Sequence, residues 1–312
     1  MVAQPQPPLA GNAAISVQTT IPPAADGTPV PGKAQDASLR YVGRVKDALV
    51  VSLLSLTPRN HGARGMGWFA RSPLSRWMTG LFVRMYGVNL AEAEGTLADY
   101  PTLEALFTRG LKPGARPIDP GADALVSPVD GRCAFVGPMV DGRIQVAPGK
   151  FLDVGRLVGR ACEPSDVAVL YLSPKDYHRI HCPREGVVRR WSYIPGTLWP
   201  VFPAAVRRVD DLFAKNERAV VCLETSEGPV DVVLVGAFGV GRITLEVCDL
   251  VTNTGGQARS GDIDAALGRG DQLGVFHLGS TVILVAPAGR WRWSVAVGDV
   301  VRLGRTIATV AR

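Results

Sequence analysis

The stretch FHLGSTVILV at positions 276–285 decides the fold and the chemistry expected of this chain. Gly279 has no Cβ atom, so a nucleophile can approach its carbonyl and its dihedral angles can be strained. Ser280 places a hydroxyl directly beside that carbonyl. The run that follows predicts a stiff, buried strand that holds the serine in place. A Gly-Ser-Thr turn is also typical of an ordinary strand entrance, so the rest of the chain must separate the two interpretations.

Short apolar runs, separated by Gly, Pro and Asp, continue from about position 121 to the end of the chain. Their hairpin-like spacing is typical of antiparallel β structure. We therefore predict an α+β fold with a mainly antiparallel β core, closed or half-closed like a barrel or sandwich, preceded by N-terminal amphipathic helices. The runs are 134–136, 144–146, 167–172, 220–223, 232–235, 243–247 and 282–285.

The composition divides the chain into three parts. Residues 1–40 are rich in Pro, Ala, Gln and Thr, which predicts a disordered or extended tail. Residues 41–118 are predicted to be a helical, membrane-associating region, and residues 119–312 a β-rich catalytic domain.

Apolar residues recur at three- and four-residue steps in two segments of the helical region. They predict one helix over 41–57, ended by Pro58, and a second over 74–86, with Ser72 as its cap. A third, short helix is expected over 102–109, burying Leu103, Leu106 and Phe107.

The apolar stripe of the helix over 74–86 has two interpretations. It either packs on the core of the protein or lies in a membrane interface, with Arg71, Arg76 and Arg84 meeting lipid headgroups.

Charge and cysteine content narrow the class of protein. The chain has 34 basic and 28 acidic residues, a net charge of +6, and no recognisable nucleic-acid motif. This mild excess suits an anionic membrane surface better than nucleic acid.

Five scattered cysteines without a CxxC pair argue against a disulfide framework or metal site and favour a reduced cytoplasmic setting. No signal peptide and no apolar run of about 18–20 residues is found, so a lipid-directed protein would be peripheral.

Activation of a serine hydroxyl requires a base, and the base requires an orienting partner. Of the four histidines, His178 and His181 lie together in SPKDYHRIHCP at 173–183. The SPKD sequence favours a turn or short helix, on which both imidazoles would face one site, whereas a strand would separate them. Asp130, in SPVDGR at 127–132, is a candidate orienting acid.

These three segments together resemble phosphatidylserine decarboxylase, a pyruvoyl-dependent enzyme made as a self-cleaving proenzyme. The similarity covers about residues 65–312. Further motifs that carry it, in the order of the family, are YGVN at 86–89, FTR at 107–109, GARPI at 114–118, LFAKNER at 212–218 and VGA at 235–237.

The resemblance implies a self-processing triad of Asp130, His181 and Ser280. His181 would take the hydroxyl proton, and Ser280 would attack the Gly279 carbonyl, so that the chain is cut between positions 279 and 280. The β and α fragments would stay associated. Ser280 would become a covalent pyruvoyl group, the cofactor that accepts electrons when carbon dioxide leaves.

The other candidate residues concern the second reaction. His178 is expected to protonate the carbanion, because the unperturbed pKa of histidine is near neutral. Lys150 and Arg109 are candidates for binding the serine carboxylate or phosphate, although each could instead be an ordinary surface charge. His277 matches no role and is expected to be structural, and His61 is expected in a solvated linker.

The resemblance also implies a substrate, a location and partners. The enzyme would convert phosphatidylserine to phosphatidylethanolamine at the cytoplasmic face of the cell membrane, on anionic phospholipid, with a homodimer left open. Departures from the family pattern at 151–153, 199–203 and 238–239 concern headgroup specificity. Two alternatives remain: a pyruvoyl-dependent decarboxylase of another amino acid or aminolipid, and an uncleaved, non-enzymatic barrel that binds membrane or a partner.

Overall fold

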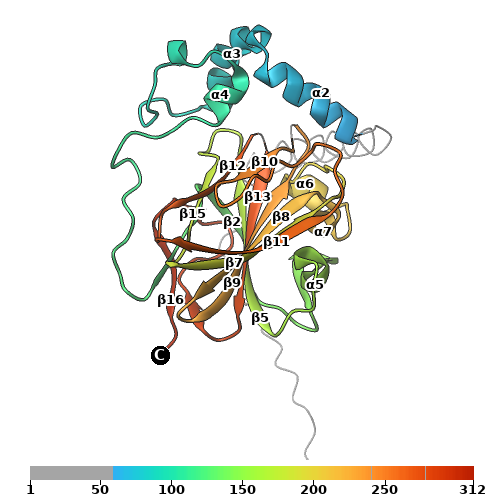
Figure 1. Ribbon diagram of the computed structural model, residues 1–312, viewed down its shortest axis with the longest axis vertical. Helices are drawn as coiled ribbons and strands as arrows, with labels where there is room; N and C mark the ends of the chain where they lie inside the picture. The colour runs from blue at the N-terminus through green and yellow to red at the C-terminus, as the bar shows by residue number, and fades with distance from the viewer. Residues whose placement is uncertain (1–58, 240, 278) are drawn as a thin grey trace, which may run out of the picture. The chain divides into compact units, whose positions relative to one another are not determined.

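The computed structural model of the protein describes residues 59–239, 241–277 and 279–312 (Figure 1). The tail predicted over 1–40 and the helix predicted over 41–57 lie outside these residues. The described helices are α2 (Arg59–Arg71), η1 (Pro73–Ser75), α3 (Arg76–Tyr86), η2 (Leu97–Asp99), α4 (Leu103–Phe107), α5 (Val154–Val158), α6 (Pro203–Val206) and α7 (Leu212–Lys215).

The β-rich part is built on one eight-stranded antiparallel sheet with the order β11-β7-β8-β9-β13-β5-β2-β15. Its strands are β2 (Gly131–Pro138), β5 (Ser165–Leu172), β7 (Gly186–Ile194), β8 (Arg218–Thr225), β9 (Gly228–Gly236), β11 (Arg259–Leu267), β13 (Ser280–Pro287) and β15 (Val300–Val301). Within the described chain the sheet does not close on itself. The prediction of an α+β, mainly antiparallel fold is confirmed in its sandwich-like form, and its barrel form is wrong.

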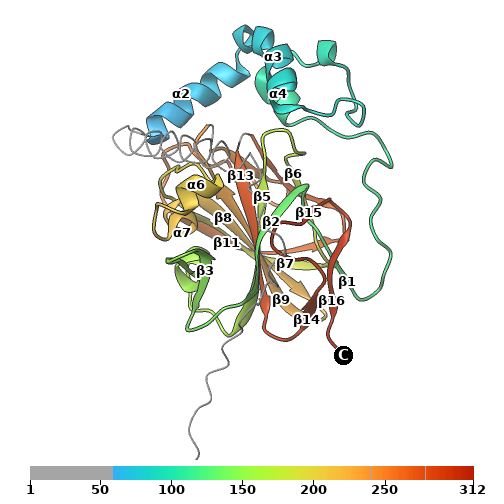
Figure 2. The ribbon, with the colours of Figure 1, turned by 180° about the vertical axis from the view of Figure 1, so that it is seen from behind.

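Both faces of this sheet are covered, as Figures 1 and 2 show. One face packs against two three-stranded sheets. They contain β1 (Ala124–Val126), β16 (Thr306–Val310) and β14 (Trp291–Trp293), and β10 (Ile243–Leu245), β12 (Gln272–Phe276) and β6 (Arg179–His181). The opposite face packs against α5, α6, α7 and the hairpin of β3 (Arg143–Ala147) and β4 (Lys150–Asp153).

The strand β13 lies inside the large sheet, between β9 and β5, and is buried on both faces. Side chains alternate along a strand. Val282 and Leu284 therefore join the core under the small sheets, whereas Ile283 and Val285 join the core under the helices. By the same alternation Ser280 belongs to the first face and Thr281 to the second.

The helical segment differs from the prediction in one place. The helix expected over 74–86 is present as η1 followed by α3, and α4 buries Leu103, Leu106 and Phe107 as expected. The linker predicted around His61 is wrong, because His61 lies in α2, where its side chain is exposed.

The apolar stripe of α3 does not pack on the core. Trp77 is 71% exposed, and Leu74, Leu81 and Met85 are also exposed. Trp68 of α2 is 66% exposed. The interpretation in which the stripe packs on the core is therefore wrong for most of its residues. Across the described residues, every helix is too short or too polar to span a lipid bilayer.

Candidate active site

Ser280 is the first residue of β13, opposite Leu172 at the end of β5 and Gly236 at the end of β9. Its side chain is fully buried, and its Oγ has no hydrogen-bond partner among the described residues. A buried hydroxyl without a partner is costly, so its presence at this position requires an explanation. The preceding Gly279 has φ +57°, a left-handed conformation that a residue with a Cβ adopts only with strain.

The loop that follows β5 runs alongside the segment before Ser280. Leu172 pairs with Ser280, and six residues later the carbonyl of His178 accepts a hydrogen bond of 2.9 Å from the amide of Phe276. The chain on both sides of the Gly279–Ser280 bond therefore contacts residues 172–178, a stretch that ends at His178 and leads into the strand of His181.

The His178 ring is buried against the Phe107 ring, with 3.9 Å between the ring centroids. Its Nδ1 lies 2.8 Å from the carbonyl oxygen of Asp176. A carbonyl only accepts, so Nδ1 carries the proton and Nε2 is left as a basic lone pair. That Nε2 is buried and has no partner among the described residues. Burial lowers the pKa of His178 to about 3, against the effect of the Asp176 carbonyl.

The His181 ring has the same tautomer in a different setting. Its Nδ1 donates to the carbonyl of Gly270 at 2.8 Å, and its Nε2 accepts from the Tyr177 hydroxyl at 3.1 Å. Burial lowers the pKa of His181, although the Gly270 carbonyl opposes the shift. Both imidazoles are thus neutral bases near pH 7. The helical turn predicted for this pair is wrong, because a turn over 174–176 leads into the strand β6.

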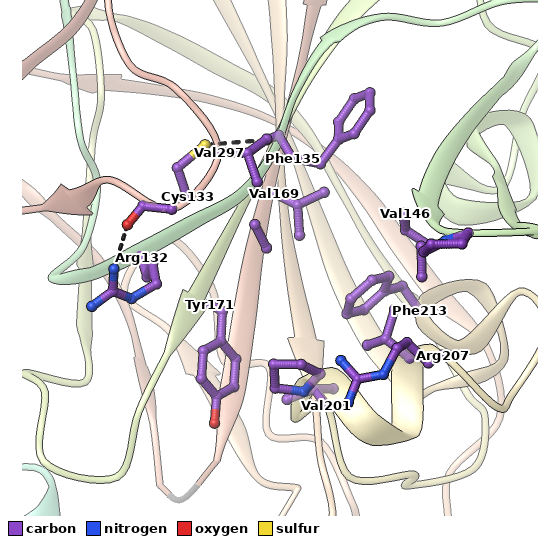
Figure 3. A pocket seen from close by; sticks show the side chains of 16 residues that line it. Arg132, Cys133, Phe135, Val146, Val169, Tyr171, Val201, Arg207, Phe213 and Val297 are labelled. Atoms are coloured by element: carbon purple, nitrogen blue, oxygen red, sulfur yellow. Dashed lines mark hydrogen bonds between the residues drawn. The ribbon is translucent and has the colours of Figure 1, made fainter. Parts of the chain in front are cut away.

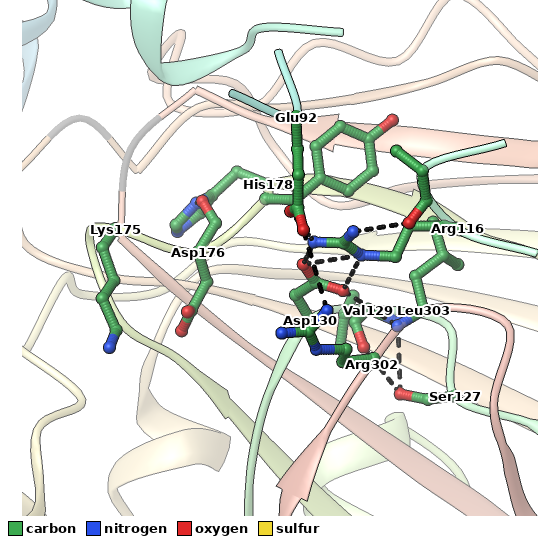
Figure 4. Close-up of polar contacts among 12 residues, drawn as sticks. Glu92, Arg116, Ser127, Val129, Asp130, Lys175, Asp176, His178, Arg302 and Leu303 are labelled. Carbon is green, nitrogen blue, oxygen red and sulfur yellow. Dashed lines mark hydrogen bonds and ion pairs between the residues drawn. The ribbon is translucent and has the colours of Figure 1, made fainter. Parts of the chain in front are cut away.

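The carboxylate of Asp130 binds Arg116 rather than a histidine, as Figure 4 shows. Arg116 Nε donates to both carboxylate oxygens at 2.9 and 3.0 Å, and the Leu303 amide donates to Oδ1 at 2.9 Å. Nη2 of the same guanidinium donates both to Asp130 Oδ2 and to Glu92 Oε2, the latter at 2.8 Å. The negative charge of Asp130 favours protonation of His181, but the structure has no hydrogen bond between the two.

The glycine after Asp130 explains why this acid is fixed in place. A Cβ on Gly131 would lie 2.4 Å from the carbonyl oxygen of Tyr171, so only glycine permits β2 to approach β5 this closely. In the Asp-Gly pair of the SPVDGR motif, the glycine therefore lies where two strands approach closely, and the carboxylate before it binds Arg116.

The two weaker candidates have structural partners. Arg109 is buried, and its Nη2 donates to the carbonyls of Lys175 and Asp176 at 2.8 and 3.3 Å. It thereby supports the carbonyl that orients His178, and the interpretation as a surface charge is wrong. The ammonium of Lys150 is paired with Asp210 at 2.6 Å.

One contact near Ser280 was not predicted from the sequence. His277 Nδ1 lies 2.9 Å from Glu104 Oε1, and its Nε2 lies 3.2 Å from Thr244 Oγ1. Arg242 Nη1 donates to the same Glu104 oxygen at 3.2 Å. Burial raises the pKa of Glu104, but the hydrogen bond and charge of His277 and the charge of Arg242 outweigh it, so the net shift is downward.

An apolar cavity of about 310 Å³ opens on the other face of the sheet (Figure 3). Tyr171 lines it and is paired with Thr281, the residue after Ser280. Phe135, Val169, Val201 and Phe213 form apolar walls, and the side chains of Arg132 and Arg207 also line it. Of the positions that depart from the family pattern, Val201 and Pro203 lie in this lining.

Comparison with known proteins gives a consistent result. Residues 103–309 match the family model described as phosphatidylserine decarboxylase. A phosphatidylserine decarboxylase proenzyme of Myxococcus xanthus is 38% identical over 85% of this chain and 100% of its own length. One from an Anaeromyxobacter species is 40% identical over 86% and 100%, and one from Nitrosococcus oceani is 42% identical over 70% and 76%. The match covers the segments that contain Asp130, the two histidines and Ser280, and the chain belongs to the phosphatidylserine decarboxylase family.

Proposed function

We propose that this chain is a proenzyme that cuts itself between Gly279 and Ser280 and then decarboxylates phosphatidylserine to phosphatidylethanolamine. The observation that carries the proposal is the buried, unpartnered Ser280 hydroxyl at the entrance of a central strand, directly after a glycine with φ +57°. Family membership supplies the reaction class, and the residues around Ser280 supply a chemical route.

In the first reaction Ser280 Oγ attacks the Gly279 carbonyl carbon while Nε2 of a neutral histidine takes the hydroxyl proton. We assign this base to His181, whose Nε2 accepts from the Tyr177 hydroxyl before the reaction. Asp130 stabilises the imidazolium through its charge, with Arg116 holding the carboxylate. The amide becomes an ester, and elimination across Cα–Cβ of residue 280 releases the Gly279 carboxylate. Water then displaces ammonia and leaves a pyruvoyl group.

The surroundings of Ser280 fit such a group. Residue 280 is fully buried and keeps strand partners on both sides, so the new end stays fixed when the chain is cut. The pyruvoyl carbonyl supplies an electron sink for the pair of electrons left by carbon dioxide. His178 is the residue we assign to hold and return a proton in this step. Its pKa of about 3 keeps Nε2 unprotonated until a negatively charged substrate lies beside it.

The cavity lined by Tyr171 is the proposed place for the apolar part of the lipid. Its walls are mostly apolar, which suits the glycerol and the first methylene groups of an acyl chain. Arg132 and Arg207 provide cations for the phosphodiester. Free serine would bury none of this apolar surface, which favours a lipid over a soluble amino acid.

Two measurements on the wild-type protein test the proposal. Denaturing mass spectrometry should find two polypeptides, residues 1–279 and 280–312, with a hydroxylamine-reactive carbonyl on the second. Carbon dioxide should be released from phosphatidylserine in mixed micelles but not from soluble serine. An intact, unreactive chain of 312 residues would contradict self-cleavage, and equal turnover of serine would contradict a lipid substrate.

We also propose that the enzyme works as a peripheral membrane protein that docks through α2 and α3. Their exposed apolar side chains, with Arg76 and Arg84 nearby, suit the interface of an anionic bilayer. The double variant Trp68→Ala/Trp77→Ala should bind phosphatidylglycerol-containing vesicles at least about tenfold more weakly. The control replaces Val140, which is exposed on the β-rich part, and unchanged sedimentation of the tryptophan variant would contradict the docking face.

The contact between Glu104 and His277 should hold the segment before the cut. Glu104→Ala removes a charged hydrogen-bond acceptor, so the half-time of self-cleavage should lengthen by roughly tenfold or more. Glu104→Gln keeps an acceptor and should slow it less. Pulse–chase synthesis measures the rate, and Glu246→Ala, which removes a carboxylate bonded to Gln272, is the control. Equal half-times for the two alanine variants would show that the contact is not needed.

A further inference from the structure

Three arginines converge on a second cavity, away from the lining of the cavity beside Tyr171. Arg64 and Arg71 come from α2, and Arg242 comes from the segment before β10. The cavity measures about 230 Å³, and its remaining lining is Ala63, Gly67 and residues 251–254, with no carboxylate among them. A cavity of this lining is matched to an anion rather than to a cation or an apolar ligand.

The charges of these arginines are only partly balanced. Among the described residues, the side chains of Arg64 and Arg71 make no hydrogen bond or ion pair, and Nε of Arg64 is buried without a partner. Their charges act only at longer range, Arg64 on Glu217 and Arg71 on Glu104, where each favours the ionised carboxylate. Arg242 shares Glu104 with His277. The other nearby carboxylate, Glu217, is buried and accepts from Tyr193 and the amide of Asn253. Leaving a buried guanidinium N–H unpaired is costly, and an anion with several oxygens would remove that cost.

The position of the cavity points to a phosphate carried by a lipid. Gly67 lines the cavity and lies between Met66 and Trp68, whose side chains are exposed. The same turn of α2 therefore presents apolar groups to the surroundings and borders the arginine cavity. Arginine forms paired hydrogen bonds with phosphate oxygens, and apolar side chains next to such a site suit the boundary between headgroups and acyl chains.

We propose that Arg64, Arg71 and Arg242 form a binding site for the phosphate of an anionic phospholipid that is not the reacting substrate. This site depends on the proposed membrane docking through α2 and α3, and it names the lipid group that α2 would bind. One bound lipid would fix α2 on the bilayer, and through Arg242 and Glu104 it would contact the network that holds His277.

The test compares two charge-matched double variants of the full chain. Arg64→Gln/Arg71→Gln removes two cations that line the cavity, and Arg76→Gln/Arg84→Gln removes two cations of α3 that lie outside its lining. Binding to phosphatidylcholine vesicles containing phosphatidylglycerol is measured by co-sedimentation. The α3 pair should lose about fivefold for each arginine, as expected of surface charge, and the cavity pair should lose clearly more. Arg64→Lys keeps the charge without the planar fork and should fall between wild type and the cavity pair.

Each outcome decides between the sources of the phosphate. Equal losses for the two pairs overturn the site, because unspecific attraction then explains them. If calorimetry shows that inorganic phosphate binds wild type but not the cavity pair, while vesicle binding is equal for both pairs, the cavity takes soluble phosphate and the lipid is wrong. If wild type does not bind vesicles, the membrane proposal itself fails. Thermal unfolding confirms that every variant is folded.

Discussion

The variant Ser280→Ala should remain one uncut chain and should release no detectable carbon dioxide from phosphatidylserine. Alanine removes the only atom that we assign to attack the Gly279 carbonyl, and without the cut no carbonyl forms at residue 280. Packing should survive, because the lost oxygen is buried and has no hydrogen-bond partner among the described residues. Removing such a group is neutral or mildly stabilising. Denaturing mass spectrometry and thermal unfolding measure both consequences on one sample.

The adjacent Thr281 provides a matched control. Its hydroxyl is also buried and unpartnered among the described residues, but it points to the opposite face of the sheet. Thr281→Val should cut at close to the wild-type rate, since valine has nearly the same shape and Ser280 is retained. If Ser280→Ala is still cut, or if Thr281→Val fails equally, the assignment of the nucleophile is wrong.

Replacing His181 and replacing His178 should have different effects on the two reactions. His181→Ala should remain uncut, because it removes the base assigned to Ser280. His178→Ala should still be cut but should decarboxylate phosphatidylserine at least about a hundredfold more slowly, the usual contribution of a general acid or base. Mass spectrometry reports the first reaction, and carbon dioxide release per mole of cut chain reports the second.

Controls distinguish chemistry from loss of structure. His61→Ala removes an exposed imidazole in α2 and should change neither reaction. His178→Ala leaves a space beside Phe107, so the less disruptive His178→Gln should be measured beside it. If both His178 and His181 variants remain uncut although they are folded, the two residues do not divide the reactions as proposed.

The pKa shifts predict how the first reaction depends on pH. Burial lowers the pKa values of both histidines, so each stays neutral, and able to accept a proton, below the ordinary histidine value of about 6.5. The rate of self-cleavage should therefore show no decline on lowering the pH from 8 to about 6.5. A decline centred near 6.5 would mean that the base is solvated rather than buried.

Much of the β-rich part could be predicted because its signals are local. The unbroken β-branched and apolar run 281–285 itself indicates a strand buried on both faces, and the small residues before it define the strand entrance. The helix α2 was missed because Gly62, Gly65 and Gly67 give its sequence low helix propensity. Contacts with the rest of the chain, such as Asn60 to the carbonyl of Gly196, accompany the helix instead.

The sequence names candidate site residues but not the contacts that these residues make. Asp130 and the arginine of the GARPI motif were both recognised, yet their pairing brings together residues that no periodicity relates. Glu104 and His277 are 173 positions apart, so only the folded chain shows that they meet. For His178 and His181, the turn before them was correctly predicted. The strand that follows it depends on pairing between β6 and β12, which spacing does not encode.

The central position of β13 has a consequence for the lifetime of the enzyme. The shorter product of the cut would supply a middle strand of the large sheet, together with β14, β15 and β16. Its exchange for a fresh copy would require the whole core to come apart. If Ser280 becomes the proposed pyruvoyl group, a molecule in which that group is damaged, for example by reduction, would therefore not be repaired by exchange of the strand. Activity would then return only with the synthesis of a new chain.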